Sequence, residues 1–422
     1  MSTYLIVVQA PAYRVREGVF ATESAFGEHL RMLRDRLAPR FDQLLFAAPQ
    51  LTEADYEAQK DSLAHVDEAE ERIEFVPLHP VDRGKLGFWQ KDARASWRRL
   101  RSAVDRAEVV HSGLADDLWR PTMLFANVAA KKAHRPLLFF VDIDFRNDTD
   151  MFKETGVWSG RTYWLNKLVY DPIKLAQVHL APYYADLVLL KSGRMVRDVG
   201  RGKDHVRNFF DTAHSAEHVI EDATLEARVA QLRDAERPLR LVFFGRFVEY
   251  KGLDRTIRAV AAARKRAGRD IHLDLIGRGE ERPRLEALVA ELDLGEAVTF
   301  RDPIPYGPEL FQAVRESDVQ IATPLVEDTP RAAFDAMAQG MPIVAFGIRY
   351  YRDLEEQSGA VLTAEWPDPD ALGDAIVTLD RDRGRLVTMA RAGVRFAREN
   401  TQDVWLDRRV RWTLELIDGA KG

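Results

Sequence analysis

The 422-residue sequence predicts two α/β domains, each built on a parallel β-sheet. Two observations support this fold class. Short apolar runs that fit buried strands alternate with helical segments in both halves of the chain. A hydrophobic content of 46% is enough to fill two cores of ordinary size. A polar stretch at about residues 212–237 is expected to separate the halves.

The first half reads as alternating strands and helices in chain order. Its strands are predicted at residues 4–8, 43–48, 73–77, 109–111, 137–141 and 185–192. Its helices are predicted at residues 23–37, 94–107 and within 158–184. The second half begins with a strand at 239–244, and the chain closes with an apolar-rich helix at 404–417. Neither half shows an internal sequence repeat.

Residues 245–345 contain three strand-to-helix junctions that carry glycines or charges. Gly245 and Arg246 end the strand 239–244, and Lys251 opens the next helix. Gly277 ends a second strand, and a third strand leads to Glu327. Ligands of open α/β sheets bind outside the carboxyl ends of the strands, so these residues are expected to share one site. Arg and Lys suit a diphosphate, and carboxylates suit sugar hydroxyls.

The third junction also suggests a helix start. Thr329 fits an N-cap and Pro330 a first helical residue, which places Glu327 just before the helix. Asp335 follows about one and a half turns later, among small apolar residues. Such an acid faces either solvent or a ligand. Small apolar neighbours are typical of a helix that packs closely on a sheet, so they favour a contact of Asp335 with a ligand. For Arg246 and Lys251 taken alone, a solvated loop would be the simpler interpretation.

Taken together, these motifs resemble a known family. The chain reads Gly245-Arg246, Lys251-Gly252, a glycine-ended strand, Glu327, seven residues, Asp335 and then AMAQGMPIVA at 336–345. This pattern resembles the nucleotide-sugar half of retaining, family-4 glycosyltransferases (glycosyl transferases group 1) of the GT-B fold. The resemblance covers about one hundred residues.

The resemblance implies an architecture and a set of roles. Residues 1–210 would form the acceptor-side Rossmann-like domain, 211–400 the nucleotide-sugar domain, and 401–422 a helix that returns to the first domain across the cleft. Arg246 and Lys251 would hold the donor diphosphate beside Gly245, Gly277 and Thr329. Glu327 would contact the sugar, and Asp335 the ribose hydroxyls.

Three features differ from the family pattern. Asp335 is one methylene shorter than the family's Glu, and DTPR at 328–331 replaces a glycine-rich segment. The loop expected at residues 11–20 contains only Gly18 where the family has two glycines. Asp142 stands where the family tends to have a histidine, so it is a candidate for a sugar hydroxyl or a cap of its own loop. His111, also at a strand end, is expected to be structural.

Composition excludes other function classes. The formal net charge of −6 argues against broad nucleic-acid binding, and the chain has no cysteine for disulfides or thiolate metal sites. Asp142-x-Asp144 resembles the metal-binding pair of GT-A glycosyltransferases, but that fold would leave Arg246, Lys251 and Glu327 unexplained. The ten histidines lack metal-ligand spacing. We therefore expect no metal and no cofactor, with a nucleotide-sugar as co-substrate.

The sequence also gives expectations about location. Residues 1–10 read as a strand rather than a signal peptide, and no run approaches the ~20 apolar residues of a membrane span, so a cytoplasmic protein is expected. The basic, aromatic segment 83–101 fits a surface helix whose Trp side chains pack on the sheet. A peripheral contact of this segment with the inner face of an anionic membrane is the alternative. The aromatics of 158–184 fit a core face, or alternatively an acceptor groove.

The resemblance predicts transfer of a sugar from a nucleoside-diphosphate sugar to an acceptor hydroxyl, with retention and without metal. A hydrolysing nucleotide-sugar epimerase and a catalytically silent nucleotide-sugar-binding or partner protein are the alternatives. The base, the sugar and the acceptor, whether saccharide, lipid-linked or small molecule, stay open.

Overall fold

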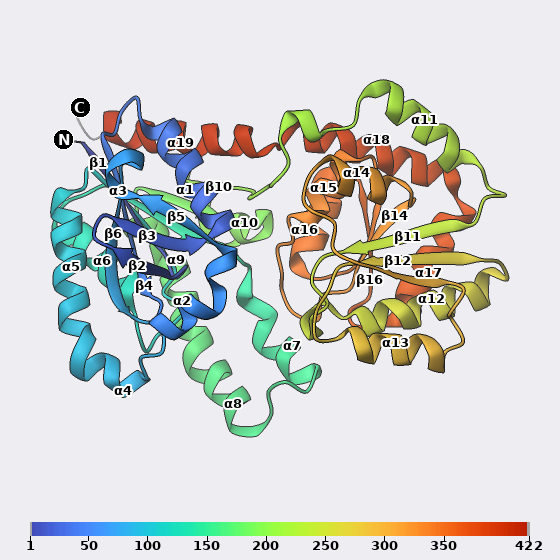
Figure 1. Ribbon diagram of the computed structural model, residues 1–422, viewed down its shortest axis with the longest axis horizontal. Helices are drawn as coiled ribbons and strands as arrows, with labels where there is room; N and C mark the ends of the chain where they lie inside the picture. The colour runs from blue at the N-terminus through green and yellow to red at the C-terminus, as the bar shows by residue number, and fades with distance from the viewer. Residues whose placement is uncertain (1, 420–422) are drawn as a thin grey trace.

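The computed structural model describes residues 2–419 and contains two sheet domains joined by long helices (Figure 1). Between residues 2 and 419 the first sheet has ten strands in the order β10-β9-β8-β7-β1-β4-β2-β3-β5, with β6 paired to β4. They are β1 (Thr3–Val7), β2 (Ala12–Arg16), β3 (Val19–Glu23), β4 (Gln43–Gln50), β5 (Leu63–Asp67), β6 (Ile73–Pro80), β7 (Val109–Gly113), β8 (Leu137–Val141), β9 (Leu187–Leu190) and β10 (Val206–Asn208). All pairings are parallel except β2 with β3 and β3 with β5.

Helices cover both faces of the first sheet, which explains why its central strands are apolar throughout. In β1, Leu5 and Val7 join one core cluster while Tyr4 and Ile6 join the other. The first cluster is closed by α5 (Ala93–Arg106), α6 (Thr122–Lys132), α9 (Asp171–Tyr184) and α10 (Gly193–Gly200). The second is closed by α1 (Ser24–Leu37) and α19 (Gln402–Gly419). The shorter helices are α2 (Glu53–Gln59), α3 (Glu68–Glu71), α4 (Lys85–Gly87), α7 (Asp148–Glu154) and α8 (Gly160–Leu165).

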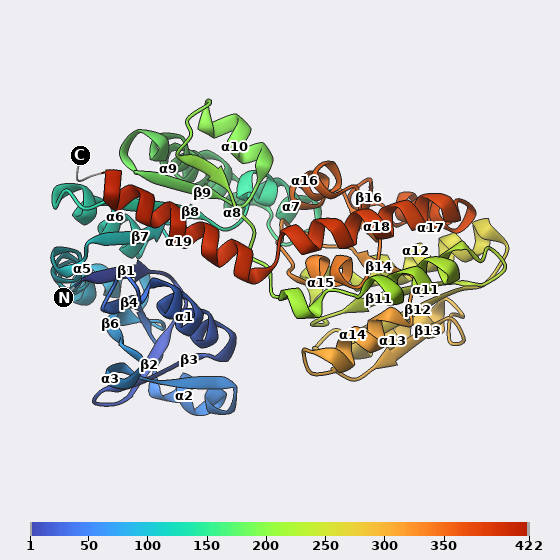
Figure 2. The same cartoon turned by 90° about the horizontal axis from the view of Figure 1, so that it is seen from above.

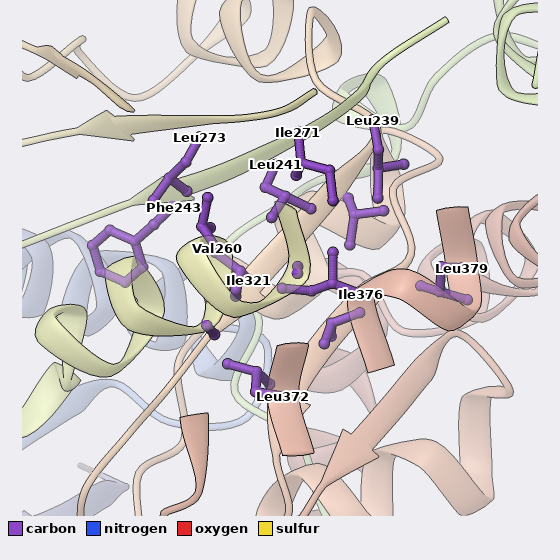
Figure 3. Close-up of a cluster of buried hydrophobic side chains, with 14 of the residues drawn as sticks. Leu239, Leu241, Phe243, Val260, Ile271, Leu273, Ile321, Leu372, Ile376 and Leu379 are labelled. Carbon is purple, nitrogen blue, oxygen red and sulfur yellow. The ribbon is translucent and has the colours of Figure 1, made fainter. Parts of the chain in front are cut away.

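The second sheet is fully parallel in the order β13-β12-β11-β14-β15-β16. Its strands are β11 (Leu239–Phe244), β12 (Ile271–Ile276), β13 (Val298–Arg301), β14 (Val319–Ala322), β15 (Ile343–Phe346) and β16 (Val361–Ala364). Its helices are α11 (Asp222–Arg233), α12 (Leu253–Ala267), α13 (Arg282–Glu291), α14 (Pro308–Arg315), α15 (Ala332–Ala338), α16 (Arg349–Ser358), α17 (Pro369–Arg381) and α18 (Arg383–Glu399). Figure 3 shows the main core, where Leu241 and Leu273 from the sheet meet Val260 of α12 and Ile376 of α17.

The C-terminal helix returns to the first domain. Figure 2 shows α18 along the second domain and α19 along the first. Helix α19 contacts α1 and β9, and its Trp405 packs edge-on against Phe210 and against Trp412. The two parallel-sheet domains and the returning helix confirm the predicted fold class. The boundaries at 210/211 and 400/401 stay predictions.

Two expected loops contain regular structure. The loop expected at residues 11–20 is the hairpin of β2 and β3, turned at Gly18, whose φ is +75°. The polar stretch at 212–237 contains α11. Its buried face has only a few apolar residues among charges, so the sequence showed no clear helical period there.

Arg228 of α11 fastens this helix to the second domain. The side chain is buried, and it donates to the carbonyl oxygens of Gly340 and Arg315 at 2.9 Å each. It also donates to the carbonyl oxygens of Ser317 at 2.7 Å and Asp318 at 3.2 Å. Burial lowers the pKa of this guanidinium to about 10. Arg228 therefore satisfies four carbonyl groups near the ends of α14 and α15.

Arg228→Met is expected to reduce the free energy of unfolding by about 3 kcal/mol, because buried carbonyl groups lose their donors. Urea denaturation followed by fluorescence measures this change. The matched control is Arg233→Met, which removes an exposed arginine from the same helix and should change stability by less than about 0.5 kcal/mol. Equal stability of the two variants would contradict the role of Arg228.

Candidate active site

Glycine turns at the carboxyl edge of the second sheet stack directly on one another. A Cβ atom on Gly277 would lie 1.9 Å from the carbonyl oxygen of Gly245, and Gly277 has a φ of +150°. A Cβ atom on Gly252 would lie 2.2 Å from the carbonyl oxygen of Thr323. Side chains at Gly277 or Gly252 would push the loops apart, so these positions require glycine.

These turns form one wall of a pocket of about 440 Å³. The pocket brings together residues from the ends of β11 and β14 and from the segment before α15. Four of the predicted binding residues line it, namely Gly245, Arg246, Lys251 and Thr329. Gly277 does not line the pocket itself, but it packs against Gly245, which does.

Three cationic side chains line this pocket. Arg246 is exposed, and its guanidinium donates to the Tyr250 hydroxyl at 3.1 Å. Lys251 forms an ion pair with Asp328. Arg331, which the sequence analysis did not single out, also lines the pocket. The pocket wall is therefore suited to a polyanion that could take the place of Asp328 beside Lys251.

Glu327 lies at the contact between the two domains. Its side chain is buried, and the backbone N–H of Arg349 donates to its Oε1 at 3.0 Å. The backbone N–H of Glu327 donates to Oδ1 of Asp148 in the first domain at 3.2 Å. Burial raises the pKa of Glu327 to about 8 and that of Asp148 to about 7. Burial therefore favours the protonated, neutral form of both carboxyls.

Asp335 lies away from the pocket wall. It is buried on α15, and the Tyr306 hydroxyl donates to its Oδ1 at 3.1 Å. Burial raises the pKa of Asp335 to about 7. Tyr306 is half exposed, so this pair connects the buried acid to the surface. Its contact with a ribose stays a prediction.

The predicted start of α15 is wrong. The helix begins at Ala332 rather than Pro330, and Thr329 does not cap it. Asp328 pairs with Lys251, and the Tyr350 hydroxyl donates to the carbonyl oxygen of Pro330 at 3.4 Å. These contacts hold the segment along the pocket instead of in a helical turn.

In the first domain, Asp142 and Asp144 have different surroundings. Asp142 is exposed and forms an ion pair with the buried Lys191, so its expected contact with a sugar hydroxyl stays a prediction. Asp144 is buried and accepts two bonds from the Arg146 guanidinium, at 2.7 and 2.6 Å. The two acids therefore have cationic partners already.

His111 is buried within the first domain. Its Nδ1 is hydrogen-bonded to the Tyr4 hydroxyl at 2.9 Å, and burial lowers its pKa to about 3. A neutral histidine in this contact fits the structural role expected from the sequence.

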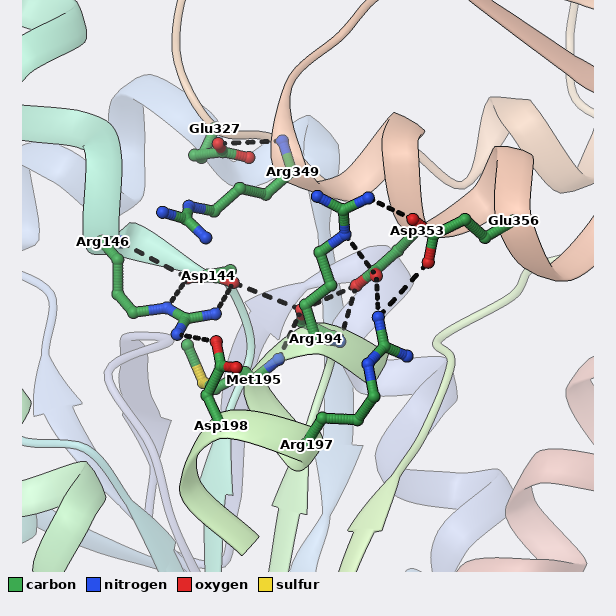
Figure 4. Close-up of polar contacts among 11 residues, drawn as sticks. Asp144, Arg146, Arg194, Met195, Arg197, Asp198, Glu327, Arg349, Asp353 and Glu356 are labelled. Atoms are coloured by element: carbon green, nitrogen blue, oxygen red, sulfur yellow. Dashed lines mark hydrogen bonds and ion pairs between the residues drawn. The ribbon is translucent and has the colours of Figure 1, made fainter.

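A polar network joins the domains beside Glu327, as Figure 4 shows. The Ser192 hydroxyl lies 2.7 Å from Oδ2 of Asp353 and 3.2 Å from Oδ2 of Asp144. The Arg349 guanidinium donates to Oδ1 of Asn147 at 2.9 Å. Apart from Asp144, no sequence motif marked these residues, because Ser192 and Asp353 lie 161 positions apart in the chain and Arg349 and Asn147 lie 202 apart.

Comparisons with known proteins agree with this geometry. Residues 238–382 match the family model described as Glycosyl transferases group 1. The 2-deoxystreptamine glucosyltransferase of Streptomyces kanamyceticus is 32% identical over 106 residues, which cover 25% of this chain and 27% of the relative. The D-inositol 3-phosphate glycosyltransferase of Corynebacterium urealyticum is 32% identical over 130 residues, or 30% of each chain. The chain thus spans less than a third of the length of these two curated relatives.

Solved structures resemble the whole chain. HepE of Anabaena in complex with UDP has a TM-score of 0.62 at 16% identity, covering 98% of this chain and 100% of its own. The sucrose-phosphate synthase of Thermosynechococcus elongatus has a TM-score of 0.61 at 16% identity, covering 100% of both chains.

The two facing parallel-sheet domains and these neighbours define a GT-B fold. The second domain carries the family signature at the carboxyl edge of its sheet. Residues 238–382 are thus similar to the glycosyl transferases group 1, in agreement with the resemblance to that group recognised in the sequence.

Glu327→Gln is expected to raise the melting temperature at pH 9 and to leave it nearly unchanged at pH 5. The carboxyl of Glu327 titrates near 4.5 in the unfolded chain and near 8 in the folded one, so the wild type loses stability as pH rises through this interval. Glutamine carries no charge and escapes this loss. We expect a gain of several degrees at pH 9.

The control is Glu291→Gln, which changes an exposed glutamate on α13. It should shift the melting temperature equally at both pH values. If Glu327→Gln behaves in the same way, Glu327 is not a buried acid with a raised pKa.

Proposed function

We propose that the protein transfers a sugar from a nucleoside-diphosphate sugar to an acceptor hydroxyl, with retention of configuration and without a metal. The observation that carries the proposal is the cationic pocket at the carboxyl edge of the second sheet, with Arg246, Lys251 and Arg331 in its wall. The buried acid Glu327 lies beside it at the domain contact. The resemblance to HepE, which was solved with UDP-glucose, supports a nucleotide-sugar donor.

The cations would act mainly on the leaving group. As the bond between the anomeric carbon and the diphosphate oxygen breaks, negative charge grows on the diphosphate. Fixed positive groups stabilise this charge more in the transition state than in the ground state. Lys251 would exchange Asp328 for a phosphate oxygen when the donor binds. Arg246, whose one side-chain bond goes to the Tyr250 hydroxyl, is accessible for the same role.

Glu327 would hold the sugar. A protonated carboxyl can donate a hydrogen bond to a sugar oxygen, and it does not repel the neighbouring diphosphate as a carboxylate would. The Arg349 N–H fixes one of its oxygens, which leaves the other for the sugar. Its raised pKa therefore suits a site shared with a diphosphate.

Retention would follow if the acceptor attacks from the diphosphate side. The acceptor oxygen forms a bond to the anomeric carbon while the donor oxygen leaves, and the acceptor proton passes to a diphosphate oxygen. Metal independence is supported by the three cations of the pocket, which supply the positive charge. Among residues 2–419, no three His, Asp or Glu side chains are arranged to hold a metal ion.

We place the protein in the cytoplasm, with segment 83–101 at the inner face of the membrane. None of the helices between residues 2 and 419 could span a bilayer. The Trp97 ring lies edge-on to Phe125 of the neighbouring helix α6 at 5.7 Å, rather than on the sheet as the sequence predicted. Trp89 is half exposed, so its ring is available for a peripheral contact with the membrane, and this contact is part of the proposal. The acceptor would be a saccharide, a lipid-linked molecule or a small molecule.

Arg246→Ala and Lys251→Ala are each expected to abolish the thermal shift given by the cognate nucleoside diphosphate. A nucleotide at ten times its Kd stabilises a protein by about 1.4 kcal/mol. The screen uses UDP, GDP, ADP and dTDP with their sugar conjugates, in the presence of a chelator. Transfer rates should fall by about 10²-fold or more in either variant. The control is Arg258→Ala, an exposed arginine on α12.

The outcomes separate the proposal from its alternatives. NMR of the anomeric signal in donor and product tests retention, and inversion would contradict that part. Turnover of a nucleotide-sugar without any acceptor would indicate an epimerase. Nucleotide binding without transfer would indicate a silent binding protein. If no nucleotide shifts the wild type, even with added magnesium or manganese, the donor site is wrong.

A further inference from the structure

The helical segment at residues 160–184 exposes apolar side chains along its outer side. Helix α8, a π-helical turn at Asn166–Tyr170 and helix α9 follow one another without a break. Val178 and Ala181 face the core of the first domain. The outer side carries an apolar ridge of residues that are 44–66% exposed, namely Trp164, Leu165, Leu168, Val169, Ile173 and Leu180.

Such a ridge is unusual on a soluble protein. Exposed apolar residues normally occur singly, and a contiguous patch of this kind marks a binding surface. The ridge residues recur every three or four positions over most of their length, which is the spacing of one helix side.

Contacts extend the ridge to the basic segment 83–101. The Trp119 indole donates to the Tyr170 hydroxyl at 2.5 Å, and the Lys85 ammonium lies 5.0 Å from the centre of the Trp119 ring. Leu86 is 73% exposed and Trp89 is 51% exposed next to this contact. The apolar ridge, Trp119, Leu86 and Trp89 together are called the docking surface below.

Basic side chains border the docking surface although the chain carries a formal net charge of −6, and most of them come from residues 83–101, since Lys167 and Lys174 beside the ridge pair with Asp150 and Asp116. Residues 160–184 contain three basic side chains and one acidic one, and residues 83–101 contain seven basic side chains and one acidic one. Apolar side chains bordered by Lys and Arg fit a bilayer with anionic headgroups. A second copy of the chain would bring the same positive charge to the contact, which disfavours a dimer.

The docking surface lies next to the contact between the domains. Helix α7 begins at Asp148, whose carboxylate accepts from the Glu327 N–H. The next residue of α7, Thr149, donates to Oδ1 of Asp171 at 3.0 Å, and the Tyr163 hydroxyl donates to Asp150 at 3.1 Å. In Figure 1, α7 and α8 project together at the lower side of the molecule, with α7 facing the second domain.

We infer that the docking surface binds an anionic lipid bilayer, and that the acceptor hydroxyl belongs to a molecule anchored in that bilayer. Apolar side chains of the ridge enter the headgroup region while Lys and Arg side chains contact lipid phosphates. The cleft then opens beside the membrane. The statement about the acceptor rests on the proposed transferase function, whereas the binding of the bilayer does not.

Sedimentation with vesicles tests this inference. The wild type is expected to bind vesicles that contain phosphatidylglycerol. Its binding should be weaker to vesicles of phosphatidylcholine alone, and weaker to the phosphatidylglycerol vesicles when the salt concentration is high. Leu168→Glu should weaken binding at least about tenfold, because a charge replaces the most exposed ridge residue. The matched control is Ala227→Glu, which adds the same charge at an exposed position of α11 in the second domain and should bind as the wild type does.

Three outcomes would overturn the inference. In the first, the wild type does not sediment with anionic vesicles. In the second, Leu168→Glu sediments with them as much as the wild type does. In the third, the protein is a dimer in solution that Leu168→Glu dissociates, and neither form binds vesicles. Melting curves and the nucleotide thermal shift of Leu168→Glu show whether the variant is folded and keeps its donor pocket. If vesicles bind and no nucleotide shifts the wild type, the proposed function fails while the docking surface stands.

Discussion

The donor pocket depends on the close stacking of backbone turns at the carboxyl edge of the second sheet. The missing side chains of Gly277 and Gly252 allow two loops to approach the backbone of neighbouring strands. Any Cβ atom there would overlap a carbonyl oxygen, so the loops would separate and carry the pocket cations with them. The positions of Arg246 and Lys251 are thus set by backbone packing rather than by contacts of their own side chains. This arrangement leaves both side chains able to change partners when an anion binds.

Charge is divided unequally between the two sides of the cleft. Cations line the pocket of the second domain, whereas the acids near the domain contact are buried and have raised pKa values. Burial without a cationic partner raises the pKa of a carboxyl, and two nearby guanidinium groups already have other partners, Arg146 with Asp144 and Arg349 with Asn147. Burial therefore favours the neutral form of Glu327 and Asp148 near the place where a diphosphate would lie. Burial of these carboxyls lowers the stability of the protein at high pH, but it also limits their repulsion of an anionic ligand.

Local patterns predicted much of the fold and part of the site. The strands at 137–141 and 239–244 have the bounds expected from their apolar runs, and the glycines at strand ends marked the pocket. The hairpin of β2 and β3 and helix α11 were missed, because their stability comes from pairing with distant strands and from Arg228. The contact of Glu327 with Asp148 joins residues 179 positions apart. A single sequence carries no signal for such a pair, since Glu327 was marked only as a ligand residue and Asp148 alone resembles an ordinary surface acid.

The placement of the apolar ridge has a topological cause. The carboxyl ends of parallel strands lie at one edge of a sheet, so the segment that leaves β8 must begin at the cleft and return along the outside of the domain. This segment supplies Asp144 and Asp148 at its start and the ridge in its helical return. Because α7 is short and is bonded to the ridge helix through Thr149 and Tyr163, Asp148 at its start is held in a fixed position relative to the ridge. A membrane that binds the ridge would therefore hold the first domain, and with it the domain contact at Asp148 and Glu327, close to the bilayer.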